Sequence, residues 1–152
     1  MTAEKFSLDT NILIYAVDAK AGARHDIAAE VVERALERGC VMTLQALSEF
    51  FAVVTRKGLV PKHEAAEMVN DWLLVVPALA PTAPAVRAAL AHSIAGCAGY
   101  WDALLVETAA EGGCGALISE DLGGRLGGVA IVNPFDGEKI SAAAQALLTQ
   151  EA

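Results

Sequence analysis

Four acidic residues stand where carboxylates from different parts of the chain could form one metal site. Asp9 and Asp121 each follow a short apolar run, whereas Glu49 and Asp102 lie near the beginnings of helical patterns. Singly, each has an ordinary explanation, such as capping a helix or favouring its first turn. Together they would repel one another and stay partly protonated unless a cation lay among them. Oxygen ligands without Cys or His favour Mg²⁺ or Mn²⁺, which can activate water and neutralise charge on a phosphate.

The elements that must position these acids alternate between short apolar strands and amphipathic helices. Strands are expected at residues 5–9, 40–44, 73–76, 115–119 and 129–132. Helices are expected from Thr10 and at residues 24–38, 45–57, 61–72, 84–95 and 100–112. This alternation predicts an α/β fold: a three-layer α/β/α sandwich with a central, mainly parallel sheet.

The predicted sheet brings the four acids to one edge. Ligands bind at the carboxyl ends of parallel strands, near the point where the strand order reverses. Asp9 ends the first strand, Asp121 follows the strand at 115–119, Asp102 lies in a first helical turn and Glu49 lies about a turn into its helix. Three other acids are expected on solvated faces: Glu107, Glu111 and Glu120.

Composition indicates one packed domain. The chain has 152 residues, of which 55% are hydrophobic, and its apolar runs are too short to cross a bilayer. We expect a cytoplasmic protein with a domain at 1–136 and a tail at 137–152 whose Ala- and Gln-rich composition suits a helix. Cys40, Cys97 and Cys114 form no CxxC pair and are expected to be buried thiols rather than zinc ligands.

The charge is negative overall and unevenly placed. Residues 1–63 carry 8 basic and 8 acidic side chains, whereas residues 64–152 carry 3 basic and 11 acidic ones, which gives the net charge of −8. This balance argues against a protein that wraps duplex DNA, but it suits a site whose cations meet a phosphate. The candidates for contact with a nucleic-acid backbone are Arg24, Arg56, Lys57 and Lys62. The alternative is that these are solvated charges on helix faces.

Five short motifs together resemble those of the PIN domain. They are residues 8–13 (LDTNIL), 45–51 (QALSEFF) with Arg56 and Lys57 downstream, 100–105 (YWDALL), 117–122 (LISEDL) and 129–135 (VAIVNPF). The last resembles the closing strand of the VapC-like branch. The motifs occur in order over nearly the whole chain. Many relatives carry a further acid two residues beyond the fourth motif's Asp, where this chain has Gly123.

The resemblance implies a ribonuclease that requires Mg²⁺ or Mn²⁺ and leaves a 5′-phosphate and a 3′-hydroxyl. We expect Asp9 and Asp102 as direct metal ligands, with Glu49 and Asp121 binding directly or through water. The neighbouring polar residues expected to orient these carboxylates or phosphate are Thr10, Asn11 and Ser119. Many relatives are toxins of type II toxin–antitoxin pairs, so the resemblance also implies a small antitoxin partner and a homodimer, for which the helices at 45–57 and 61–72 are candidate interfaces.

Three other functions remain open at this point. The same fold could hold RNA or protein without cutting, or could process RNA outside a toxin–antitoxin system. Phosphoryl transfer to Asp9 is the third, but the phosphatase motif needs a second Asp where Asn11 stands. A receiver domain needs an acidic pair beside its first strand and a late Lys, and neither is present.

Overall fold

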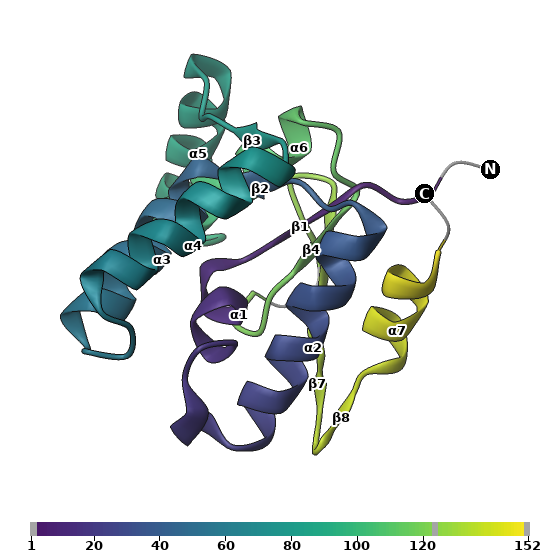
Figure 1. Cartoon of the computed structure of the whole chain (residues 1–152). Helices are drawn as coiled ribbons and strands as arrows, with labels where there is room; N and C mark the ends of the chain where they lie inside the picture. Colours follow the sequence, from purple (N-terminus) through teal and green to yellow (C-terminus); the bar gives the residue numbers. More distant parts are fainter. Residues whose placement is uncertain (1–2, 123–124, 151–152) are drawn as a thin grey trace.

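A computed structural model describes residues 3–122 and 125–150 of the chain, so the expectation about Gly123 lies outside the described residues. The elements, in order, are β1 (Phe6–Leu8), α1 (Thr10–Tyr15), the 3₁₀ helix η1 (Ala19–Ala21), α2 (Ala23–Arg38), β2 (Met42–Thr43), α3 (Leu44–Arg56), α4 (Lys62–Val75), β3 (Ala78–Leu79), α5 (Ala83–Ala95), α6 (Tyr100–Glu111), β4 (Ala116–Ile118), β5 (Arg125–Leu126), β6 (Val129–Val132), β7 (Phe135–Asp136), β8 (Lys139–Ile140) and α7 (Ala142–Thr149). Figure 1 shows their arrangement.

The central sheet has the strand order β1-β4-β6-β5, with β1, β4 and β6 parallel and β5 antiparallel to β6. The parallel pair β2-β3 adjoins β1 through a bridge between Ser7 and Val41, where the Val41 N–H donates to the Phe6 carbonyl at 3.0 Å. The chain therefore leaves β1 toward β2 on one side and returns as β4 on the other. The strand order reverses beside β1, which is where such sheets form their sites.

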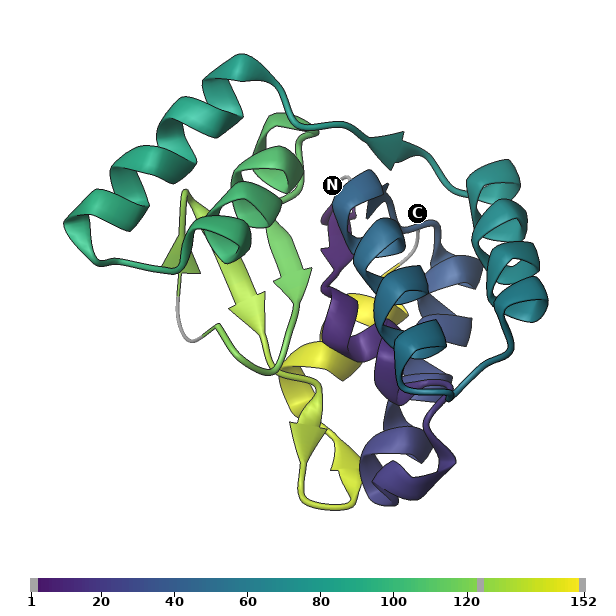
Figure 2. The ribbon, with the colours of Figure 1, turned by 90° about the vertical axis from the view of Figure 1, so that its left-hand side faces the viewer.

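Helices cover both faces of the sheet (Figures 1 and 2). In Figure 2, α5 and α6 lie on one side of the strands, and α1, α2, α3 and α4 lie on the other. Phe6, Leu8, Leu117 and Ile118 of the central strands are completely buried between these layers. The expected α/β fold, with a mainly parallel central sheet flanked by helices, is confirmed.

The strand predicted at residues 73–76 is wrong. Helix α4 continues to Val75, where the Val76 N–H donates to the Trp72 carbonyl at 2.9 Å, and the short strand β3 follows Pro77. The apolar run resembled a buried strand, yet Leu74 and Val75 are 84% and 71% exposed on the helix surface. Periodicity does not distinguish a short apolar strand from a helix end. Strands β5, β7 and β8 were not predicted.

The last helix belongs to the same core as the sheet. Ser141 caps α7, and Ala144, Leu147 and Leu148 are buried in the main hydrophobic cluster. The tail expected at residues 137–152 thus includes a helix that packs into the main core. Among the described residues, no helix is long and apolar enough to cross a membrane.

The cysteines differ from one another in environment. Cys40 and Cys114 are buried, and burial raises the pKa of both thiols to about 11. Their thiols are therefore protonated and unreactive at neutral pH. The expectation of burial is wrong for Cys97, which follows α5 and is exposed.

Candidate functional site

The four predicted acids line one open cleft of about 400 Å³. Its lining consists of Asp9, Thr10, Asn11, Ile14, Glu49, Ala52, Val53, Arg56, Asp102 and Asp121. The acids come from the end of β1, from α3, from the first turn of α6 and from the segment after β4. The sheet topology thus brings together residues up to 112 positions apart in the sequence.

Asp9 is positioned by the parallel pairing of β1 and β4. Its backbone N–H donates to the Ile118 carbonyl at 2.9 Å, so Ser119 lies beside it. The Ser119 hydroxyl donates to Asp9 Oδ2 at 2.6 Å, and the Thr10 N–H donates to Asp9 Oδ1 at 2.7 Å. Asp9 is only 8% exposed. Asp9 therefore caps α1 and lines the cleft at the same time.

Glu49 is held by neighbours from two helices. The Thr10 hydroxyl donates to Glu49 Oε2 at 2.9 Å, and the Gln45 side-chain amide donates to Glu49 Oε1 at 3.1 Å. The same Gln45 amide donates to the Trp101 carbonyl at 2.9 Å, which connects α3 to the beginning of α6. Sequence reasoning missed Gln45, although its position four residues before Glu49 places both on one helix face.

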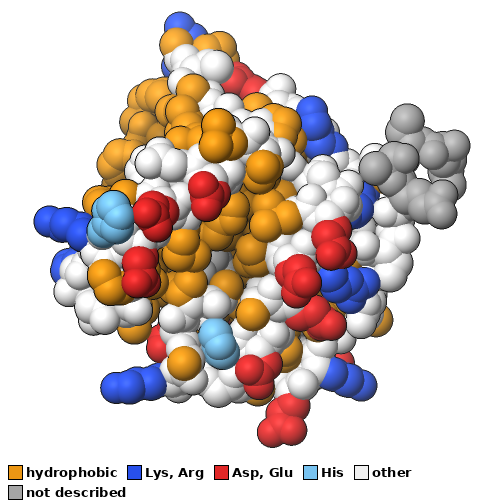
Figure 3. All heavy atoms as spheres, viewed as in Figure 1, with side chains coloured by type: hydrophobic (Ala, Val, Ile, Leu, Met, Phe, Trp, Pro, Cys, Tyr) orange, Lys and Arg blue, Asp and Glu red, His pale blue; other side chains and the backbone are white. Residues whose placement is uncertain are grey.

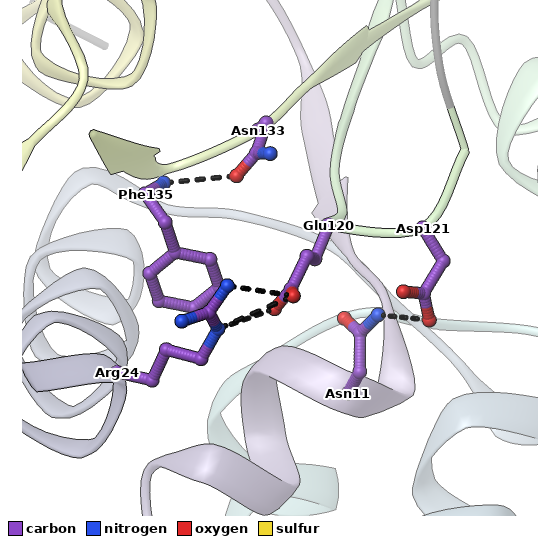
Figure 4. A network of polar contacts seen from close by, with 6 residues as sticks. All are labelled: Asn11, Arg24, Glu120, Asp121, Asn133 and Phe135. Atoms are coloured by element: carbon purple, nitrogen blue, oxygen red, sulfur yellow. Dashed lines mark hydrogen bonds and ion pairs between the residues drawn. The ribbon is translucent and has the colours of Figure 1, made fainter. Parts of the chain in front are cut away.

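Asp102 and Asp121 are more exposed than Asp9. Asp102 lies in the first turn of α6, where the helix dipole favours a negative charge. The Asn11 side-chain amide donates to Asp121 Oδ2 at 2.9 Å, as Figure 4 shows. The Asn11 Oδ1 atom is buried without a hydrogen-bond partner among the described residues. Asn11 therefore connects α1 to the segment that carries Asp121.

The carboxylates affect one another's ionisation. The pKa of Asp9 is raised, mainly by burial, with the Asp102 and Asp121 charges adding to the effect of burial and the hydrogen bonds from Ser119 and Thr10 opposing it. The pKa of Asp102 is also raised, first by burial and then by the charges of Asp121 and Glu49. A bound cation would relieve this repulsion.

The other predicted residues do not all lie at the cleft. Of the four basic candidates, Arg56 lines the cleft, Lys57 and Lys62 are exposed outside its lining, and Arg24 pairs with Glu120. The expectation that Glu107 and Glu120 lie on solvated faces is wrong. Glu107 lies 2.8 Å from His92 with 15% of its side chain exposed. Glu111 is exposed and accepts a hydrogen bond from Thr82.

The donor set suits a hard divalent cation, since the residues that line the cleft offer four carboxylates and include neither His nor Cys. Within residues 3–122 and 125–150, no three His, Cys, Asp or Glu side chains lie close enough together to hold one ion. Mg²⁺ commonly binds through one or two carboxylates and keeps several waters, so two of these acids would be enough. The residues therefore fit Mg²⁺ or Mn²⁺ by chemistry.

The raised pKa of Asp9 predicts that this residue's contribution to the stability of the metal-free fold falls as pH rises. The folded protein holds the Asp9 proton more tightly than the unfolded chain, so this contribution to the free energy of unfolding falls from pH 3.8 upward, through the raised pKa, and then levels off. In EDTA, the melting temperature of Asp9→Asn minus that of wild type should therefore increase as pH rises from 3.8 to 8. Mn²⁺ at pH 7 should stabilise wild type more than the variant. A constant difference across this pH range would contradict the prediction.

Comparison with known proteins identifies the class of this fold and site. A model of the PIN domain family matches residues 7–123. The chain belongs to the PIN domain family.

Solved structures of VapC toxins in VapBC complexes share the fold at low sequence identity. VapBC2 from Rickettsia felis, bound to a promoter DNA fragment, is 17% identical with a TM-score of 0.59, covering 86% of this chain and 98% of that one. VapC20 from Mycobacterium tuberculosis, a Sarcin-Ricin loop cleaving toxin, is 18% identical with a TM-score of 0.60, covering 74% and 87%. A toxin–antitoxin complex from Klebsiella pneumoniae is 17% identical with a TM-score of 0.62, covering 89% and 99%. No curated protein matches this sequence significantly.

Proposed function

We propose that this protein is a metal-dependent endoribonuclease that hydrolyses RNA phosphodiester bonds. The observation that carries the proposal is the convergence of four carboxylates from four segments on one cleft, where burial and mutual repulsion raise the pKa of two of them. Such repulsion destabilises a fold unless a cation lies among the acids. Perturbed carboxylates in a cleft are also typical of active sites. Family membership supports the same conclusion.

Asp9 and Asp102 would hold Mg²⁺ or Mn²⁺, with Glu49 and Asp121 binding directly or through water. The cation supplies Lewis acidity, an activated water and charge neutralisation at the phosphate. Three uncharged neighbours hold the carboxylates: Ser119 fixes Asp9, Thr10 fixes Glu49 and Asn11 fixes Asp121. Each donates a hydrogen bond to a carboxylate oxygen, which orients the carboxylate so that its remaining lone pairs can meet a cation.

Arg56 is the basic residue best placed to meet the RNA backbone, because it lines the cleft with the four acids. Arg56→Gln should raise KM for RNA about threefold to tenfold and make the dependence of affinity on salt shallower by roughly one unit of log–log slope. Lys62→Gln is the matched control, since Lys62 is exposed outside the cleft lining. Equal effects of the two substitutions would rule out a local role for Arg56.

We further propose that the protein acts as a toxin that a small antitoxin neutralises, and that it pairs as a homodimer. The fold shared with VapC proteins of VapBC complexes supports the first part. Large exposed apolar side chains on α4 and α5 support an interface: Leu73, Leu74, Val75, Leu90 and Ile94. Figure 3 shows apolar surface over these helices. Sedimentation of the purified protein as a monomer at micromolar concentration would contradict the homodimer, and unimpaired growth on expression would contradict the toxin.

A non-cutting scaffold is the second candidate, because among the described residues no group of three or more His, Cys, Asp or Glu side chains is arranged to hold a metal ion. The deciding experiment incubates purified protein with single-stranded and structured RNA in Mg²⁺, in Mn²⁺ and in EDTA. Cleavage that requires the metal supports the nuclease. Tight RNA binding without cleavage under any of these conditions would favour the scaffold.

A further inference from the structure

Arg24 makes an ion pair and a ring contact next to the cleft rather than an open basic surface. Its Nε donates to both Glu120 carboxylate oxygens at 3.2 and 3.1 Å, and its Nη2 donates to Glu120 Oε1 at 3.0 Å. The guanidinium carbon lies 5.2 Å from the centre of the Phe135 ring. Figure 4 shows the guanidinium between the ring and the carboxylate. The positive charge is therefore already engaged on two sides.

The partners of Arg24 are themselves fixed. The Phe135 N–H donates to Asn133 Oδ1 at 2.9 Å, and its ring meets the Tyr15 ring edge-on with centroids 5.5 Å apart. The pKa of the Tyr15 phenol is raised, first by burial and then by the Glu120 charge. Tyr15 of α1 and Phe135 of β7 thus pack beside the ion pair between Arg24 of α2 and Glu120, which follows β4.

Glu120 connects this cluster to the site through the chain itself. Ser119 before it donates to Asp9, and Asp121 after it accepts from Asn11. The three consecutive residues therefore have three separate anchors. Without the anchor at Glu120, the residues after Ser119 would be held only by the Asn11–Asp121 hydrogen bond, so Asp121 would be less firmly positioned.

The geometry makes this pair stronger than an ordinary surface ion pair. Exposed pairs contribute little, but a two-nitrogen fork on one carboxylate and a guanidinium stacked on a ring are the favourable cases. Glu120 retains only 20% side-chain exposure, against 49% for Arg24. Lysine could supply the charge but neither the fork nor the stacking.

We propose that Arg24 is a positioning residue, which acts through Glu120 to hold Asp121 in the carboxylate cleft, and that it is not an RNA contact. This inference rests on the proposed nuclease for its catalytic consequence. It replaces the role expected for Arg24 from the sequence. It also gives a role to Glu120, which precedes Asp121 in the chain but does not itself line the cleft.

The test compares Arg24→Gln, Arg24→Lys and Glu120→Gln with wild type and with Arg87→Gln, an exposed arginine on α5. Backbone amide hydrogen exchange over residues 119–122 in the metal-free protein should rise about tenfold in the first three proteins and stay unchanged in Arg87→Gln. Unchanged exchange in all three overturns the proposal. This readout needs no catalysis, so it stands even if the wild type cleaves no RNA.

Kinetics then separate positioning from substrate binding. All three substitutions should lower kcat for RNA cleavage about 10- to 100-fold and weaken Mn²⁺ binding about tenfold, with KM and its salt dependence unchanged. In an Asp121→Asn background, Arg24→Gln should weaken Mn²⁺ binding no further, because both changes act on one ligand. A higher KM with a shallower salt slope and an unchanged kcat would instead make Arg24 an RNA contact and overturn the proposal.

Discussion

Asp9→Asn should reduce kcat for RNA cleavage about a thousandfold. A cation held by Asp9 would supply several kcal/mol of charge stabilisation, and each 1.4 kcal/mol corresponds to roughly a tenfold change in rate. The substitution should leave the fold intact, because asparagine caps helices as well as aspartate and can still accept the Thr10 N–H. The measurement is single-turnover cleavage of a defined RNA in Mn²⁺, with melting temperature recorded beside it.

The matched control for this substitution is Asp71→Asn, which removes the same charge from an exposed position on α4. It should retain wild-type kcat. If Asp9→Asn cleaves within tenfold of wild type while the control behaves normally, Asp9 is not a metal ligand. Equal losses in both proteins would instead indicate that cleavage depends on net charge alone.

Asp102→Asn should produce a loss of similar size, about a thousandfold, although Asp102 lies on a different element from Asp9. The two acids would bind the same cation, so the double variant should be little worse than either single one. The same RNA assay measures all three proteins. A double variant whose losses multiply fully would show that the two residues act independently, contrary to a shared metal.

The sequence predicted the convergence of the four acids on one cleft better than it predicted the side-chain contacts around that cleft. Asp9 and Asp121 follow buried apolar strands, and parallel strands align their carboxyl ends, so their meeting follows from the alternating pattern alone. Glu49 follows from the helical spacing of α3, which buries Leu47 and Phe50 and turns Glu49 toward the cleft. These arguments need only local periodicity and the topology rule.

Contacts between distant side chains could not be predicted in the same way. Arg24 and Glu120 are 96 residues apart, and no local pattern indicates that α2 packs beside the segment after β4. Periodicity also failed at the end of α4, because an apolar helix surface and a buried strand produce the same run of Leu and Val. Helix α7 packs against α2 in the core, and the tail's own composition does not reveal this contact.

The most direct test of the nuclease proposal is to map the ends of the RNA fragments left by the purified wild-type protein, free of any partner, in Mn²⁺ and in EDTA. The four-carboxylate site predicts cleavage only with the metal, and fragments with 5′-phosphate and 3′-hydroxyl ends. Fragments ending in a 2′,3′-cyclic phosphate, or cleavage that persists in EDTA, would contradict metal-dependent hydrolysis at Asp9, Glu49, Asp102 and Asp121.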